Sequence, residues 1–199
     1  MEYRLKANEL IHTLVAWNEL LSGKGKIHLI ACGGTALTLL GYKESTKDVD
    51  FLVPNEDDYE RLIEFLTKAG YELVTGYGWQ RSGEITIFDL YPGNKVYSTE
   101  LLDSPLSKNG NKKIKEWKRI YLGVLNPIDL VISKMFRGTE ADVQDSLILF
   151  QNEKIDVAKF EQRYRKTAKY ETNEDKMLKS LDYLLMKLKR MDRKANDKK

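Results

Sequence analysis

The chain has 199 residues, of which 42% are hydrophobic and 32% are charged, and its formal net charge is +3. This length and composition are typical of one globular domain with a substantial core, or of one domain with a small appendage. A net charge this small does not by itself indicate a nucleic-acid-binding protein, so any basic footprint must be local.

Cys32 is the only cysteine, and His12 and His28 are the only histidines. These counts exclude an internal disulfide and a Cys/His zinc cluster, and an unpaired thiol fits a cytoplasmic protein. The N-terminal segment carries charges throughout and lacks a small-residue cleavage site, so we do not interpret it as a signal peptide. No run of about 18 apolar residues is present, and we expect no contact with a membrane.

The N-terminal part of the chain alternates short apolar runs, which are typical of strands, with amphipathic segments, which are typical of helices. We expect helices over residues 3–22, 35–42 and 54–71, and strands over residues 26–32 and 48–53. Asn55 is placed as an N-cap before three acids, and Gly41 is placed as a C-terminal cap.

The rest of the chain changes character near residue 125. Residues 71–97 predict two or three antiparallel strands with a turn at Pro92-Gly93, and residues 104–118 predict a polar loop before a short strand. After Pro127, four helical segments follow. We therefore expect an α+β fold with an α/β domain in residues 1–125 and a helical lobe in residues 126–199.

Two carboxylates, Asp48 and Asp50, stand one residue apart in the apolar stretch DVDFLV. Alternation along a strand places both on one face, with Cα atoms roughly 6–7 Å apart. Two partly desolvated anions at this spacing repel each other, and a proton or a bound cation relieves the repulsion. Because Mg²⁺ and Mn²⁺ prefer oxygen ligands, the pair predicts a divalent metal site. The alternative interpretation is an edge strand with a solvated acidic face.

Gly33 and Gly34 lie between the predicted strand 26–32 and the helix that follows it. Without a Cβ, the backbone can approach a phosphate closely, and the free N–H groups of the helix can bind it. Thr35 could bond the same phosphate through its hydroxyl. The alternatives are a tight turn without a ligand and an ordinary hydroxyl in the first turn of a helix.

The segment ACGGT is followed by KDVDFL, with 13 residues between Gly34 and Asp48. This pattern resembles the signature of the nucleotidyltransferase (polymerase β-like) superfamily. The downstream segment NPIDLVISKMFRGTEADVQDSLIL is similar to small bacterial and archaeal nucleotidyltransferases that include abortive-infection toxin-like members. The resemblance covers residues 27–150 and implies a mixed β-sheet flanked by helices, followed by the helical lobe.

The resemblance also implies a reaction, in which Mg²⁺ or Mn²⁺ supports transfer of a nucleoside monophosphate from a nucleoside triphosphate to an acceptor hydroxyl. The metal ligands would be Asp48, Asp50 and a third carboxylate, for which Asp89 in EITIFDLY is the candidate. We expect Asp89 to share a strand face with Ile85 and Ile87 and to act in proton transfer. Alternatively, Asp89 only bonds the backbone near the Pro-Gly turn.

In the second half of the chain, the resemblance assigns Lys134, Arg137 and Asp142 to nucleotide binding. Lys134 would reach the triphosphate as a point charge, or it is a snorkelling lysine on an apolar helix. Arg137 is a second candidate of the same kind. Asp142 would face the site and pair with Lys134 or place the acceptor, or it is a helix cap.

The toxin-like resemblance implies an RNA acceptor, tRNA in the first place, and a cognate antitoxin as partner. Residues 187–199 hold seven Lys or Arg, which would track an RNA backbone or form a solvated helix end. Two other functions compete with transfer: a catalytically inactive nucleotide- or partner-binding module of the same fold, and an RNA-binding protein that uses this basic segment.

Overall fold

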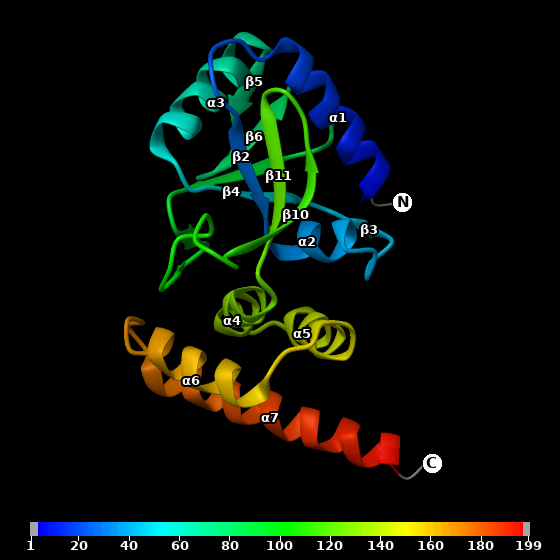
Figure 1. Ribbon diagram of the computed structural model, residues 1–199, viewed down its shortest axis with the longest axis vertical. Helices are drawn as coiled ribbons and strands as arrows, with labels where there is room; N and C mark the ends of the chain where they lie inside the picture. The colour runs from blue at the N-terminus through cyan, green and yellow to red at the C-terminus, as the bar shows by residue number, and fades with distance from the viewer. Residues whose placement is uncertain (1–3, 197–199) are drawn as a thin grey trace. The chain divides into compact units, whose positions relative to one another are not determined.

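The computed structural model describes residues 4–196, and their course is shown in Figure 1. The chain forms two compact units. The first contains the residues up to Tyr97 together with Asp103–Asn126, and the second contains Ser98–Leu102 and the residues from Pro127 onward. We expected one division after residue 125; the units divide after Asn126, and a short earlier segment belongs to the second unit.

A seven-stranded mixed β-sheet forms the centre of the first unit. In spatial order its strands are β10 (Asn111–Glu116), β11 (Ile120–Leu125), β2 (Ile27–Ala31), β4 (Val49–Val53), β7 (Phe88–Pro92), β6 (Gly78–Arg81) and β5 (Tyr71–Leu73). The pairs β11–β2 and β4–β7 are parallel, and the other pairs are antiparallel. All five residues of β4 are buried, as expected for a central strand covered on both faces. The mixed sheet with flanking helices confirms the fold class that the sequence predicts.

Three helices pack on this sheet: α1 (Ala7–Leu20), α2 (Gly33–Leu39) and α3 (Glu56–Lys68). Trp17 of α1 lies against α3 and the sheet, with ring centroids 6.2 Å from Phe65 and 4.8 Å from Phe88. Helices α1 and α3 are therefore in contact through the rings of Trp17 and Phe65. Helix α2 contacts β4 and β11, so it begins beside the strand that carries Asp50.

Helix α3 has the ends that the sequence predicts. The Asn55 side chain accepts a hydrogen bond from the Asp58 N–H at 3.0 Å. Acidic side chains occupy the first turn, where their negative charge interacts favourably with the positive end of the helix dipole. The chain leaves the helix through Gly70, whose φ is +83°. A side-chain cap and a left-handed glycine thus limit the helix to 13 residues.

Four short strands complete the description: β1 (Leu5–Lys6), β3 (Ser45–Thr46), β8 (Lys95–Val96) and β9 (Thr99–Glu100). Strand β1 pairs antiparallel with β3. The helix predicted from residue 3 therefore begins later, at Ala7, and residue 3 itself lies outside the described residues.

Two strand predictions need correction. The sequence predicts a polar loop over residues 104–118, but Asn111–Glu116 form β10, an edge strand whose side chains mostly face water. The sequence also predicts a strand through Ile85 and Ile87, but β7 begins at Phe88 and Ile85 is 69% exposed. Asp89 therefore does not share a strand face with these two isoleucines.

The second unit contains the four predicted helices, which are α4 (Pro127–Arg137), α5 (Glu140–Asn152), α6 (Val157–Ala168) and α7 (Glu174–Asn196). Aromatic side chains fill its core: the Tyr164 ring lies 5.0 Å from Phe136 and 5.6 Å from Phe160. The Tyr164 hydroxyl donates to the Met177 carbonyl at 2.9 Å, which joins α6 to α7. The basic segment 187–199 continues α7 to Asn196, and its last three residues lie outside the described range. Among the helices described, none is long and apolar enough to cross a membrane.

The stability of the first unit depends on the buried face of α1. Leu14 is fully buried, whereas Leu20 on the same helix is 68% exposed. We expect Leu14→Ala to lower the free energy of unfolding by about 2–5 kcal/mol through lost burial and a cavity. Leu20→Ala should change it by less than about 0.5 kcal/mol. Urea denaturation of both variants measures the difference, and equal losses would contradict this packing.

Candidate functional site

The parallel pairing of β4 and β7 places Asp50 directly opposite Asp89. Residues paired across neighbouring strands direct their side chains to the same face of a sheet, so these two carboxylates are neighbours. On the other side of β7, Gly78 of β6 is paired with Asp89 and offers it no side chain. The structure thus brings together two of the three predicted metal ligands by strand register.

The three carboxylates differ in exposure. Asp50 is 3% exposed, Asp89 is half-buried, and Asp48, which precedes β4 by one residue, is exposed. Burial, and then the negative charge of Asp48, raise the pKa of Asp89 above its usual value. Across the part of the chain that the structure describes, no side chain donates a hydrogen bond to the Asp89 carboxylate and no cation pairs with it. The site therefore holds negative charge that a proton or a cation would relieve.

This charge and the oxygen donors fit a Mg²⁺ or Mn²⁺ ion. Among residues 4–196, however, no three Asp, Glu, His or Cys side chains already converge as a set of metal ligands. Such a cage is not needed, because Mg²⁺ is usually bound by one or two carboxylates together with substrate phosphates. Asp48, Asp50 and Asp89 fit the ion through their chemistry and strand placement, and metal binding by them stays a prediction.

Gly33 is the first residue of α2, and the Asp50 carboxylate lies against it. The φ of Gly33 is +57°, and a Cβ at this position would overlap the Asp50 Oδ2 atom and lie 2.8 Å from Cγ. At Gly34, a Cβ would lie 2.8 Å from the Thr46 hydroxyl oxygen. Both glycines therefore have a steric role beside β4, and their contact with a phosphate stays a prediction.

Thr35 ties the start of α2 to the strand that carries the carboxylates. Its hydroxyl donates to the Asp48 carbonyl at 3.1 Å and accepts from the Asp50 N–H at 2.9 Å. Nearby, the Cys32 N–H donates to the Asp50 carbonyl at 3.1 Å. The fully buried Thr35 thus fixes the backbone around Asp50, and its contact with a phosphate stays a prediction.

The structure adds a residue that sequence reasoning missed. The Tyr97 hydroxyl donates to Asp50 Oδ1 at 2.5 Å, and its ring centroid lies 5.0 Å from that of Tyr91. Strand alternation could have found Tyr91, because it follows Asp89 by two residues on β7 and so shares its face. No local pattern marks Tyr97, which meets Asp50 from 47 residues away in the sequence.

The predicted nucleotide-binding residues of the second unit form an ionic network, in which Lys134 and Asp142 are buried and Arg137 is exposed. Lys134 is 2% exposed, and its Nζ lies 2.7 Å from Asp145 Oδ2 and 3.9 Å from Asp142 Oδ1. Asp142 Oδ1 also forms an ion pair with Arg137 Nη2 at 2.5 Å. Asp142 forms a capping box with Thr139 at the start of α5.

Burial acts to raise the pKa of Asp142, but hydrogen bonds from Arg137 and Thr139 and the nearby positive charges hold it below its usual value. The structure thus shows Lys134 pairing with Asp142, as one interpretation proposed, and shows Asp142 as a helix cap. Contact of Lys134, Arg137 or Asp142 with a nucleotide stays a prediction.

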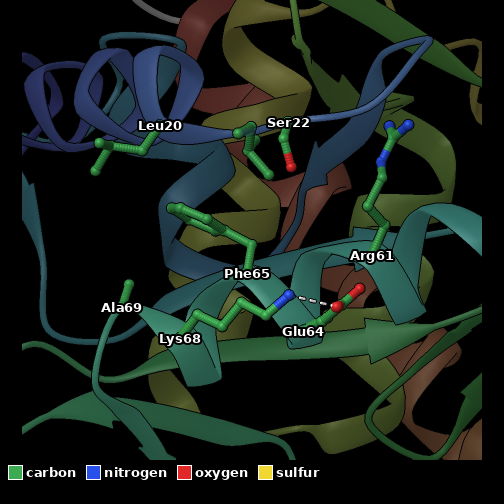
Figure 2. Close-up of a pocket in the computed structure, with 8 residues that line it drawn as sticks. Leu20, Ser22, Arg61, Glu64, Phe65, Lys68 and Ala69 are labelled. Carbon is green, nitrogen blue, oxygen red and sulfur yellow. Dashed lines mark hydrogen bonds and ion pairs between the residues drawn. The ribbon is translucent and has the colours of Figure 1, made fainter.

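A cavity of about 310 Å³ lies between the end of α1 and α3, away from the carboxylates. Figure 2 shows its lining, in which Phe65 lies between Leu20 and the paired Lys68 and Glu64 side chains. It is lined by Leu20, Leu21, Ser22, Arg61, Glu64, Phe65, Lys68 and Ala69, none of which is a predicted site residue. The candidate site is therefore the strand face with Asp50 and Asp89.

No family model matches the chain, and no curated protein matches it. Among solved structures, the chain is similar to the crystal structure of the aminoglycoside nucleotidyltransferase ANT(2″)-Ia in complex with adenylyl-2″-tobramycin. The TM-score is 0.54, the sequence identity is 13%, and the match covers 79% of this chain and 94% of the other. The fold is of the nucleotidyltransferase type. At 13% identity, this similarity establishes the fold and does not establish the activity.

The contact between Gly33 and Asp50 can be tested with a matched pair of glycines. Gly33 and Gly41 both have positive φ, at +57° and +78°, but a Cβ at Gly41 would have no atom within 4 Å. Gly41→Ala should therefore cost only backbone strain, about 1–2 kcal/mol. Gly33→Ala should cost about 1–3 kcal/mol more, because the methyl displaces the Asp50 carboxylate. Urea denaturation measures both losses; equal values would mean that Asp50 does not occupy this space.

The raised pKa of Asp89 predicts a pH dependence in the metal-free protein. The Asp89 carboxyl group binds its proton more tightly in the folded state than in the unfolded chain. The stabilisation of the fold by this protonated group is therefore complete below the pKa of Asp89 in the unfolded chain. It is lost as pH rises through the pKa of Asp89 in the folded state. Asp89→Asn should therefore increase the free energy of unfolding at pH 7, with a gain that shrinks toward pH 4. Urea denaturation in EDTA measures it, with the exposed Glu60→Gln as charge control. A gain that did not change with pH would refute this cause.

Proposed function

We propose that the chain is a nucleotidyltransferase that moves a nucleoside monophosphate from a nucleoside triphosphate to an acceptor hydroxyl. The observation that carries the proposal is the register of Asp50 and Asp89 across β4 and β7, beside the glycine turn that opens α2. The fold similarity to a nucleotidyltransferase supports the same activity.

In this proposal, Asp48, Asp50 and Asp89 would hold Mg²⁺ or Mn²⁺, which would supply positive charge near the phosphoryl oxygens. Asp89 acts as the general base that takes the proton of the acceptor hydroxyl. The hydroxyl oxygen forms a bond to the α-phosphorus, the bond from that phosphorus to the bridging oxygen breaks, and pyrophosphate leaves.

The predicted nucleotide contacts are considered for each compact unit by itself. Gly33, Gly34 and Thr35 would present the first N–H groups of α2 to the phosphates. Of the two predicted cations, Arg137 is better suited to bind phosphate, because its side chain is 39% exposed while that of Lys134 is 2% exposed. Lys134 would mainly order α4 against α5 through Asp145.

For the acceptor, the toxin-like resemblance favours RNA, with tRNA as the first candidate and a cognate antitoxin as a partner. The basic side chains of α7 support an RNA acceptor, because Lys189, Arg190 and Arg193 lie together along that helix. The similar solved structure instead holds an adenylylated small molecule, adenylyl-2″-tobramycin. A labelling assay with both acceptor classes separates these cases.

The assay mixes purified protein with Mg²⁺, each α-labelled nucleoside triphosphate in turn, and either total RNA or tobramycin. Label should pass to an acceptor, and both Asp48→Ala and Asp50→Ala should reduce the rate at least about 100-fold, because metal-bound charge contributes several kcal/mol. Asp57→Ala, which removes an exposed acid of α3, should keep the wild-type rate.

Other outcomes assign the competing functions. Nucleotide binding that requires Mg²⁺ but moves no label to any acceptor would identify an inactive nucleotide-binding module. RNA binding that persists in Asp48→Ala and is lost on removal of residues 187–199 would identify an RNA-binding protein. Absence of nucleotide binding would contradict the proposal at its first step.

A further inference from the structure

The Asp50 carboxylate is held from two sides. Its Oδ2 atom lies against the backbone of Gly33, and its Oδ1 atom accepts the Tyr97 hydroxyl at 2.5 Å. Since Asp50 is 3% exposed, water has little access to either oxygen. The orientation of this carboxylate is therefore set by its neighbours in the fold.

Tyr97 is itself held in an uncommon backbone conformation. Its φ is +53°, a region that bulky residues seldom occupy and that persists only where the surrounding structure imposes it. Its ring packs on Tyr91, which is 4% exposed and belongs to β7, the strand that carries Asp89. Packing and backbone together direct the Tyr97 hydroxyl at Asp50.

The chemistry of this hydroxyl fits a hydrogen-bond donor. A phenol O–H is a hydrogen-bond donor, and here it lies 2.5 Å from Asp50 Oδ1. It is a stable donor to a neighbouring carboxylate.

We propose that Tyr97 is a positioning residue, whose hydroxyl fixes the Asp50 carboxylate in the orientation that binds the divalent ion. This inference rests on the proposed nucleotidyl transfer. Groups that hydrogen-bond to metal ligands orient those ligands, and their loss typically reduces metal affinity or activity about 10- to 100-fold. Tyr97→Phe removes the hydroxyl and keeps the ring, so it isolates this effect.

The first measurement is of Mn²⁺ affinity. Electron paramagnetic resonance detects the bound Mn²⁺ in the presence of a non-hydrolysable nucleotide. Tyr97→Phe should weaken Mn²⁺ binding about 10- to 100-fold relative to the wild type. Tyr77→Phe is the matched control, because its ring packs on Tyr91 at 5.0 Å in the same aromatic cluster but is 41% exposed. The control should bind Mn²⁺ like the wild type.

The second measurement needs no metal. A double-mutant cycle of Tyr97→Phe and Asp50→Ala, followed by urea denaturation in EDTA, measures the coupling between the two side chains. A hydrogen bond to a charged group should appear as coupling of about tenfold or more in the unfolding equilibrium constant. The same cycle with Tyr77→Phe should show none.

The outcomes separate this inference from the function on which it rests. Coupling together with weakened Mn²⁺ binding supports it. Absence of coupling would overturn it whatever the metal data show, and coupling with unchanged or tighter Mn²⁺ binding would reduce Tyr97 to a structural role. If the double-mutant cycle shows coupling between Tyr97 and Asp50 but the wild-type protein binds no Mn²⁺, both the positioning role and the metal-dependent transfer would be overturned.

Discussion

The central constraint in this structure is the parallel pairing of β4 with β7. This pairing places the carboxylates of Asp50 and Asp89 side by side. Parallel strands cannot be joined by a tight turn, and the chain between them supplies a crossover of α3, β5 and β6. Adjacent anions in a buried sheet are unfavourable unless their surroundings hold them. The hydroxyl of Tyr97, the backbone of Gly33 and the hydroxyl of Thr35 all act on Asp50 or its backbone. Contacts from two segments, helix α2 and the turn that carries Tyr97, thus hold Asp50 beside Asp89.

Elements with strong local signals could be predicted closely. Helix α3 occupies the segment that the sequence indicates, because Asn55 caps its start and Gly70 follows its end. Strand β10 could not be found in this way, since an edge strand faces water and its NKKIKE sequence lacks an alternating apolar face. The start of β7 was also missed, because Ile85 looks like a strand residue in sequence but lies on the surface.

The residues of the candidate site also differ in whether a local sequence signal marks them. Strand alternation and the glycine spacing pointed to Asp48, Asp50, Gly33 and Gly34, since these signals are local. Alternation alone could not show that Asp48 is exposed while Asp50 is buried. The Tyr97 contact depends on a left-handed backbone and on distant packing, neither of which a sequence pattern encodes. At Lys134 the apolar neighbours suggested a snorkelling lysine, but its ammonium group is buried against Asp145, a partner that was identified only in three dimensions.

The missing side chain at Gly33 also has an evolutionary consequence. As long as Asp50 is present, its carboxylate fills the space that any larger residue at position 33 would occupy. Once Asp50 is lost, the steric part of this constraint disappears, and only the left-handed backbone still favours glycine. The two positions are therefore epistatic, and the order of substitutions matters: a change at 33 is tolerated better after the acid has gone than before. Among relatives of this chain, a larger residue at position 33 would mark a lineage that has already given up the carboxylate.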